Sequence, residues 1–122
     1  MNVFYLVAAL LIVLIALAHS VLGERLLIMP LYKGDLSFMP LPSLASKRVM
    51  RFAWHLTTVA WWGLGVLVIF YARSLNTTGT LVQIRSIAVL FLVSCLMALV
   101  FTRGRHFSWI VFLAISLLLW FG

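Results

Sequence analysis

Four continuous hydrophobic stretches, separated by short polar or charged segments, dominate the pattern of residues along this chain of 122 residues. None of them alternates between apolar and polar side chains with the period of two that is typical of membrane β-barrels. A helix needs roughly 20 apolar residues to cross a hydrocarbon core of about 30 Å, and the stretches reach or approach that length. The pattern therefore predicts four transmembrane helices, at about residues 3–27, 47–73, 81–102 and 105–121.

The composition favours a membrane location for the whole chain. Hydrophobic residues make up 66% of it, charged residues 9%, and the mean hydropathy is +1.22. Soluble globular domains carry roughly 25% charged residues. We expect a single all-α integral membrane domain over residues 1–122, in which four helices form an up-down antiparallel bundle. We also expect the protein to lie in a bacterial inner membrane.

The basic residues predict the orientation of the chain in the membrane. The formal net charge is +7, and seven of the nine Lys and Arg residues lie in the first and third connections. By the positive-inside rule, these two connections face the cytoplasm and both termini lie on the outer side. A positive charge can also indicate nucleic-acid binding. Here, however, the basic residues flank hydrophobic stretches and form no soluble basic patch, so we expect no nucleic-acid partner.

Three histidines lie at the same end of three different hydrophobic stretches. His19 closes the first, His55 opens the second, and His106 opens the last. At about 1.5 Å per residue, His55 lies about 6 Å inside the boundary marked by Arg51. Ionisable residues in transmembrane helices usually face the bundle interior or an aqueous cavity. In a closed bundle the three imidazoles would converge; the alternative is that each forms only local hydrogen bonds at the interface.

Converging imidazoles would suit a cofactor. Neutral imidazole is the commonest metal ligand in proteins, and His19, His55 and His106 with Glu24 would hold Zn, Cu or Fe with one position open. A non-covalent haem with two of these histidines as axial ligands is an alternative. The first functional hypothesis is therefore a histidine-lined site near the cytoplasmic face that serves redox or membrane-enzyme chemistry. Motifs of soluble enzymes, such as a phosphate-binding glycine loop, are missing from the sequence.

Above these histidines, the first cytoplasmic connection is long and unusually apolar. Residues 26–46 include three prolines, beginning with Pro30, and only two charged residues, Lys33 and Asp35. Proline interrupts regular helices, so we expect no long helix here. We expect the connection to lie on the membrane interface or to fold across the end of the bundle as a lid over the histidines.

Two further hypotheses rest on charge. Five arginines are expected at the cytoplasmic rim, where they would attract anionic lipid head groups: Arg25, Arg48, Arg51, Arg103 and Arg105. This rim favours a non-catalytic small subunit of a larger membrane complex or a lipid-interacting protein, with no cofactor.

A third hypothesis is a proton or ion transporter that uses His55 and Glu24. It would act as a homo-oligomer, because four short helices rarely enclose a pathway alone.

Overall fold

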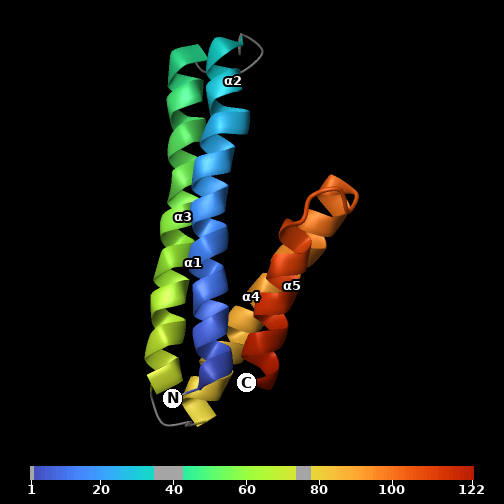
Figure 1. Cartoon of the computed structure of the whole chain (residues 1–122). Helices are drawn as coiled ribbons and strands as arrows, with labels where there is room; N and C mark the ends of the chain where they lie inside the picture. Colours follow the sequence, from blue (N-terminus) through green and yellow to red (C-terminus); the bar gives the residue numbers. More distant parts are fainter. Residues whose placement is uncertain (1, 35–42, 74–77) are drawn as a thin grey trace.

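The computed structural model describes residues 2–34, 43–73 and 78–122, and nearly all of them are helical. The first helical stretch has three consecutive parts: α1 (Val3–Gly23), the π-helical segment η1 (Glu24–Ile28) and α2 (Met29–Lys33). Three separate helices follow: α3 (Ser43–Arg73), α4 (Thr78–Thr102) and α5 (Ser108–Phe121). These residues contain no strand, which confirms the all-α class (Figure 1).

Three helical stretches are long and apolar enough to cross a membrane: Val3–Lys33, Leu44–Arg73 and Thr78–Thr102. The fourth helix, α5, is apolar but has only 14 residues. At about 1.5 Å per residue it is about 21 Å long, less than the hydrocarbon core of about 30 Å. The helices therefore indicate a membrane protein, but α5 is shorter than a straight spanning helix.

The first helical stretch extends beyond the predicted end at residue 27, as far as Lys33. Pro30 would normally interrupt it, because proline lacks an N–H and clashes with the carbonyl four residues earlier. The π-helical turn lies just before it, and there the Met29 N–H bonds to the Glu24 carbonyl. Such local π-helical adjustments allow proline in membrane helices. The proposed lid falls mainly on residues 35–42, which lie outside the described residues.

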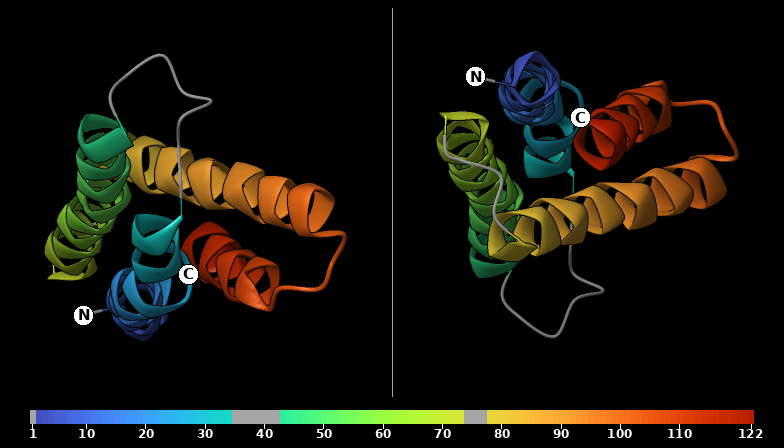
Figure 2. Two further views of the ribbon diagram at one scale, coloured as in Figure 1. Left: turned by 90° about the horizontal axis from the view of Figure 1, so that it is seen from above. Right: turned by 90° about the horizontal axis from the view of Figure 1, so that it is seen from below.

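The helices form two hairpins that diverge from each other. In Figure 1, α1 lies beside α3 and α4 beside α5. The hairpins meet near the chain termini, and the views along the first hairpin in Figure 2 show α4 and α5 extending away from it. The four helices therefore do not lie alongside one another over their whole length.

Asn2 connects three helices at the meeting point. Its side-chain oxygen accepts hydrogen bonds from the backbone N–H groups of Phe4 and Tyr5 and so caps α1. Its side-chain amide donates to the Gly122 carbonyl after α5, over 2.6 Å. Its backbone N–H donates to the Ala72 carbonyl near the end of α3, over 2.9 Å. The start of the chain thus holds both hairpins together.

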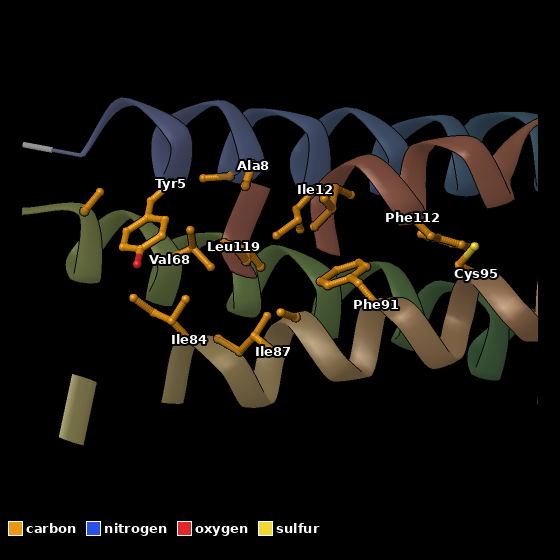
Figure 3. Packing of buried hydrophobic residues seen from close by; sticks show 14 residues of the cluster. Tyr5, Ala8, Ile12, Val68, Ile84, Ile87, Phe91, Cys95, Phe112 and Leu119 are labelled. Atoms are coloured by element: carbon orange, nitrogen blue, oxygen red, sulfur yellow. The ribbon is translucent and has the colours of Figure 1, made fainter. Parts of the chain in front are cut away.

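The buried core lies where the hairpins meet (Figure 3). Tyr5 and Ile12 from α1 pack with Val68 from α3, Phe91 from α4 and Leu119 from α5. Large hydrophobic side chains are also exposed along every long helix. Helices that are apolar on all sides are typical of lipid surroundings. The core therefore fixes one end of the molecule and leaves the other end of the first hairpin uncovered by α4 and α5.

Candidate functional site

A polar site lies on the first hairpin, beyond the region where α4 and α5 cover it. Ser20 and Glu24 are four residues apart on the first helical stretch, and Arg51 and His55 are four residues apart on α3. Residues with this spacing share one face of a helix. Because α1 and α3 run in opposite directions, Glu24 meets Arg51 and Ser20 meets His55. We call Ser20, Glu24, Arg51 and His55 the Glu24–His55 network.

The hydrogen bonds of the network are continuous. The Ser20 hydroxyl lies 2.8 Å from His55 Nδ1, and Glu24 Oε2 lies 3.2 Å from His55 Nε2. Arg51 Nε donates to Glu24 Oε2 over 3.1 Å, and Arg51 Nη2 donates to Glu24 Oε1. Both ring nitrogens of His55 and both carboxylate oxygens of Glu24 therefore have partners from the facing helix.

The network can exist with either a neutral or a protonated imidazole. If Nε2 carries the single proton, it donates to Glu24 while Nδ1 accepts from the Ser20 hydroxyl; in the protonated form both nitrogens donate. The formal charge of the network changes from zero to +1 between these states. The side chains of Glu24 and His55 are 22% and 39% exposed, so neither is sealed inside the hairpin.

The arrangement suits proton exchange better than acyl transfer. A serine hydroxyl beside an imidazole that is oriented by a carboxylate is also the pattern of an activated nucleophile. Acyl transfer, however, needs hydrogen-bond donors for the developing oxyanion. Ser20 lies inside α1, where backbone N–H groups are engaged in helical hydrogen bonds. The helix that carries Ser20 thus offers no backbone donors for that role.

His19 lies next to the network and is enclosed by aromatic side chains of α3. Its ring stacks on Trp54, with centroids 4.2 Å apart and ring planes 6° apart, and lies 4.9 Å from the ring of Trp61. The indole N–H of Trp54 donates to the His19 carbonyl over 3.0 Å. Gly23 makes this approach possible, because a Cβ atom there would overlap the Trp54 indole.

Two buried polar atoms continue the polar residues toward the middle of the hairpin. Within the described residues, His19 Nε2 and Thr58 Oγ1 are buried and have no hydrogen-bond partner. Thr58 is only 3% exposed and lies one helical turn beyond His55. A buried polar group without a partner costs about 1–3 kcal/mol. These two atoms therefore call for an explanation beyond packing.

The third predicted histidine does not join this site. His106 lies on the turn between α4 and α5, is exposed, and has its Nδ1 atom 2.9 Å from the Ser108 hydroxyl. This turn is at the divergent end of the second hairpin, away from the first hairpin (Figures 1 and 2). The structure brings His19 and His55 onto facing turns of α1 and α3 and leaves His106 outside. The divergence of the hairpins is the reason.

The structure does not support the predicted metal cluster. In the part of the chain it describes, no group of three or more His, Cys, Asp or Glu side chains is placed to hold a metal ion. Glu24 is engaged by Arg51 and His55. To bind a metal or a haem iron, His55 would have to release Ser20 or Glu24.

The five predicted rim arginines fall into two groups. Arg51 belongs to the network, while Arg25 and Arg48 are exposed near it on the first hairpin. Arg103 and Arg105 lie on the turn between α4 and α5 and are also exposed. Because the hairpins diverge, these arginines do not form a single rim.

The ion pair between Arg51 and Glu24 was not predicted from the sequence, which assigned the two residues to different sites. A signal for it exists in the spacing of four that separates Ser20 from Glu24 and also Arg51 from His55. On antiparallel helices, two such pairs can meet residue for residue. Alignment of the two pairs on antiparallel helices would therefore have identified all four residues of the network.

Comparison of the chain with protein families, with curated proteins and with solved structures finds no significant match. The structure describes a helical protein with three helices long and apolar enough to cross a membrane and with a hydrogen-bonded ionisable network on its first hairpin.

Proposed function

We propose that the protein is a small proton transporter in which His55 takes up and releases the transported proton. One observation carries the proposal: the His55 ring is hydrogen-bonded to both Ser20 and Glu24, on a hairpin apolar enough to cross a membrane. Histidine is the side chain whose charge changes most readily near neutral pH. Ionisable residues within membrane helices commonly form proton relays.

Opposite charges act on His55 at the same time. The Glu24 carboxylate attracts a protonated imidazole, and the Arg51 guanidinium, which pairs with the same carboxylate, repels it. Transport requires a site that binds its ion and also lets it leave. A carboxylate shared between Arg51 and His55 meets both needs, because Arg51 takes part of the attraction that would otherwise hold the proton.

The next steps of the path are the buried polar atoms of His19 and Thr58. Neither has a hydrogen-bond partner within the described residues, and both are buried; His19 adjoins Ser20 in the sequence, and Thr58 lies one helical turn from His55. A water molecule or a small rearrangement of the His19 ring would give these atoms a partner during transport and extend the relay inward. The proposal thus accounts for two polar groups that packing alone leaves without a role.

In this proposal the protein acts as a homo-oligomer in a bacterial inner membrane. The helices cross the membrane in alternating directions with both termini outside, so that the network faces the cytoplasm, as the arginine distribution favours. The hairpin that carries the network is not covered there by α4 and α5. The same face of a second copy would enclose the path that one chain leaves open.

Proton flux into liposomes tests the proposal. Purified protein is reconstituted with a pH-sensitive dye trapped inside, and a potassium diffusion potential drives protons inward. We expect flux above that of empty vesicles from the wild-type protein and a loss of this excess in His55→Gln and Glu24→Gln, which remove the titrating ring and its carboxylate partner. Wild-type vesicles no more permeable to protons than empty ones would refute the function.

His106→Gln is the matched control for these variants. It removes an imidazole of the same chemistry from an exposed turn that has no contact with the network. Flux in His106→Gln should equal that of the wild type. A loss of flux in this control comparable with that in His55→Gln would show that the network has no special role.

A further inference from the structure

A second site lies at the opposite end of the molecule, where the two hairpins meet. There a cavity of about 170 Å³ opens between three helices. Its walls include Tyr5 from α1, Ile84 and Arg85 from α4, and Leu119 and Trp120 from α5. None of these residues belongs to the Glu24–His55 network. The cavity therefore has no role in the proposed proton transport.

Arg85 brings a positive charge to this cavity, and in the part of the chain that the structure describes no carboxylate side chain pairs with it. The sequence contains no Asp or Glu after Asp35, and Glu24 is paired with Arg51. Neither ion pair found among the described residues involves Arg85. Its guanidinium lies over the Trp120 ring, 5.6 Å from the centroid, which positions the charge at the cavity. An anion from outside the chain would complete the site.

Most of the other residues that line the cavity are apolar. Tyr5, Ile84 and Leu119, which are among them, are at most 2% exposed. An apolar cavity of about 150 Å³ is large enough to hold a benzene-sized molecule, so this space accepts a small group beside the guanidinium. The ligand should therefore combine an anionic group with an apolar part.

The surface of α4 shows where the apolar part of the ligand would lie. Val89, one turn inward from Arg85, is exposed on the same helical face. Leu92, Val93 and Leu96 continue this exposed apolar surface toward the middle of α4. A soluble anion would leave this apolar surface uncovered, whereas the acyl chain of a lipid would cover it. The geometry thus favours a lipid over a free anion.

We propose that this cavity binds the phosphate-bearing head group of an anionic phospholipid, with Arg85 as the partner of the phosphate and the acyl chains along α4. Arginine suits this role because its planar guanidinium can form two parallel hydrogen bonds to phosphate. The cavity walls come from both hairpins, so the bound lipid would hold α1, α4 and α5 together where the hairpins meet. Binding to the folded protein alone also stabilises it.

Native mass spectrometry of the full-length protein tests this proposal. Protein released from detergent is titrated with phosphatidylglycerol or with phosphatidylcholine, and the dissociation constant of the first bound lipid is measured. We expect a clear preference for phosphatidylglycerol and a loss of about tenfold in its affinity in Arg85→Gln, since a charge-assisted contact to phosphate is removed. Arg103→Gln, which removes an exposed arginine from the distant α4–α5 turn, should change the affinity by less than about twofold.

A second variant keeps the test decisive if Arg85→Gln folds poorly. Leu81 also lines the cavity, and Leu81→Phe reduces its volume while leaving Arg85 in place. It should weaken phosphatidylglycerol binding as well. Equal effects of Arg85→Gln and Arg103→Gln would overturn the proposal, because binding would then reflect only general surface charge. So would equal affinity for the two lipids, or displacement of the lipid by an equal concentration of inorganic phosphate.

Discussion

At the scale of single residues, Gly23 decides how closely the helices of the first hairpin approach. A Cβ atom at this position would overlap the indole of Trp54, whereas a Cβ atom at Gly63 would meet nothing within 4 Å. We therefore expect Gly23→Ala to lower the free energy of unfolding by about 1–3 kcal/mol through overpacking. Gly63→Ala should raise it by up to about 1 kcal/mol, because alanine favours helix. Reversible unfolding in mixed micelles measures both, and equal stabilities of the two variants would contradict the packing described.

Substitution of Thr58 tests whether its buried hydroxyl takes part in proton transport. Thr58→Val removes a hydroxyl that has no hydrogen-bond partner among the residues that the structure describes. The protein should therefore be as stable as the wild type or more stable by up to about 1 kcal/mol, while its proton flux falls. Thr57→Val is the matched control. The Thr57 hydroxyl is exposed and donates to the Ala53 carbonyl of the preceding turn, so this variant should keep full flux. Unchanged flux in Thr58→Val would remove Thr58 from the path.

At the scale of elements, the turn between α4 and α5 contains two residues in the left-handed region. Arg103 has a φ of 52° and Gly104 a φ of 73°, and the Gly104 N–H closes the end of α4 by bonding to the Leu99 carbonyl over 2.9 Å. This backbone conformation has a free-energy cost of about 1 kcal/mol for a residue with a side chain, but not for glycine. Arg103→Gly should therefore stabilise the protein by about 1 kcal/mol and Gly104→Ala should destabilise it by a similar amount. The same unfolding measurement applies, and destabilisation by Arg103→Gly would show that the turn has another conformation.

The helical class and most element positions could be predicted from the sequence, because long apolar stretches leave few alternatives to helices in a membrane. The end of the first helix could not. Pro30 indicates an interruption, and only the π-helical turn at Glu24–Ile28 allows the helix to continue to Lys33. Whether a proline stops a helix depends on hydrogen bonds several residues away, which local sequence rules do not contain.

The candidate site was predicted only in part. Single residues with unusual chemistry can be identified from the sequence, but contacts between residues far apart in the sequence are harder to predict. His55 and Glu24 were both identified, since an ionisable residue at a membrane boundary stands out in the sequence. Convergence with His106 was expected only because a closed bundle was assumed. Whether hairpins stay parallel depends on the packing around residues such as Asn2 and Tyr5, whose partners lie far away in the sequence.

At the scale of the whole molecule, the two termini are neighbours. The Asn2 side-chain amide donates to the Gly122 carbonyl, so both ends lie at the same end of the fold. We therefore expect short epitope tags before Asn2 and after Gly122 to be accessible from the same side of the membrane, and on the outer side if the arginine distribution sets the orientation. Antibody labelling of intact and permeabilised spheroplasts measures this. Tags on opposite sides would contradict the arrangement of the hairpins.

Proton transport in this proposal requires His55 and Glu24 to act as one proton-binding unit. Proton flux into liposomes should be measured for His55→Gln, Glu24→Gln and the double variant under the same driving potential. Residues that act as a unit give strongly non-additive effects, so each single variant should reduce the flux nearly to that of empty vesicles, and the double variant should be no lower. Wild-type flux in His55→Gln would contradict proton transport through His55.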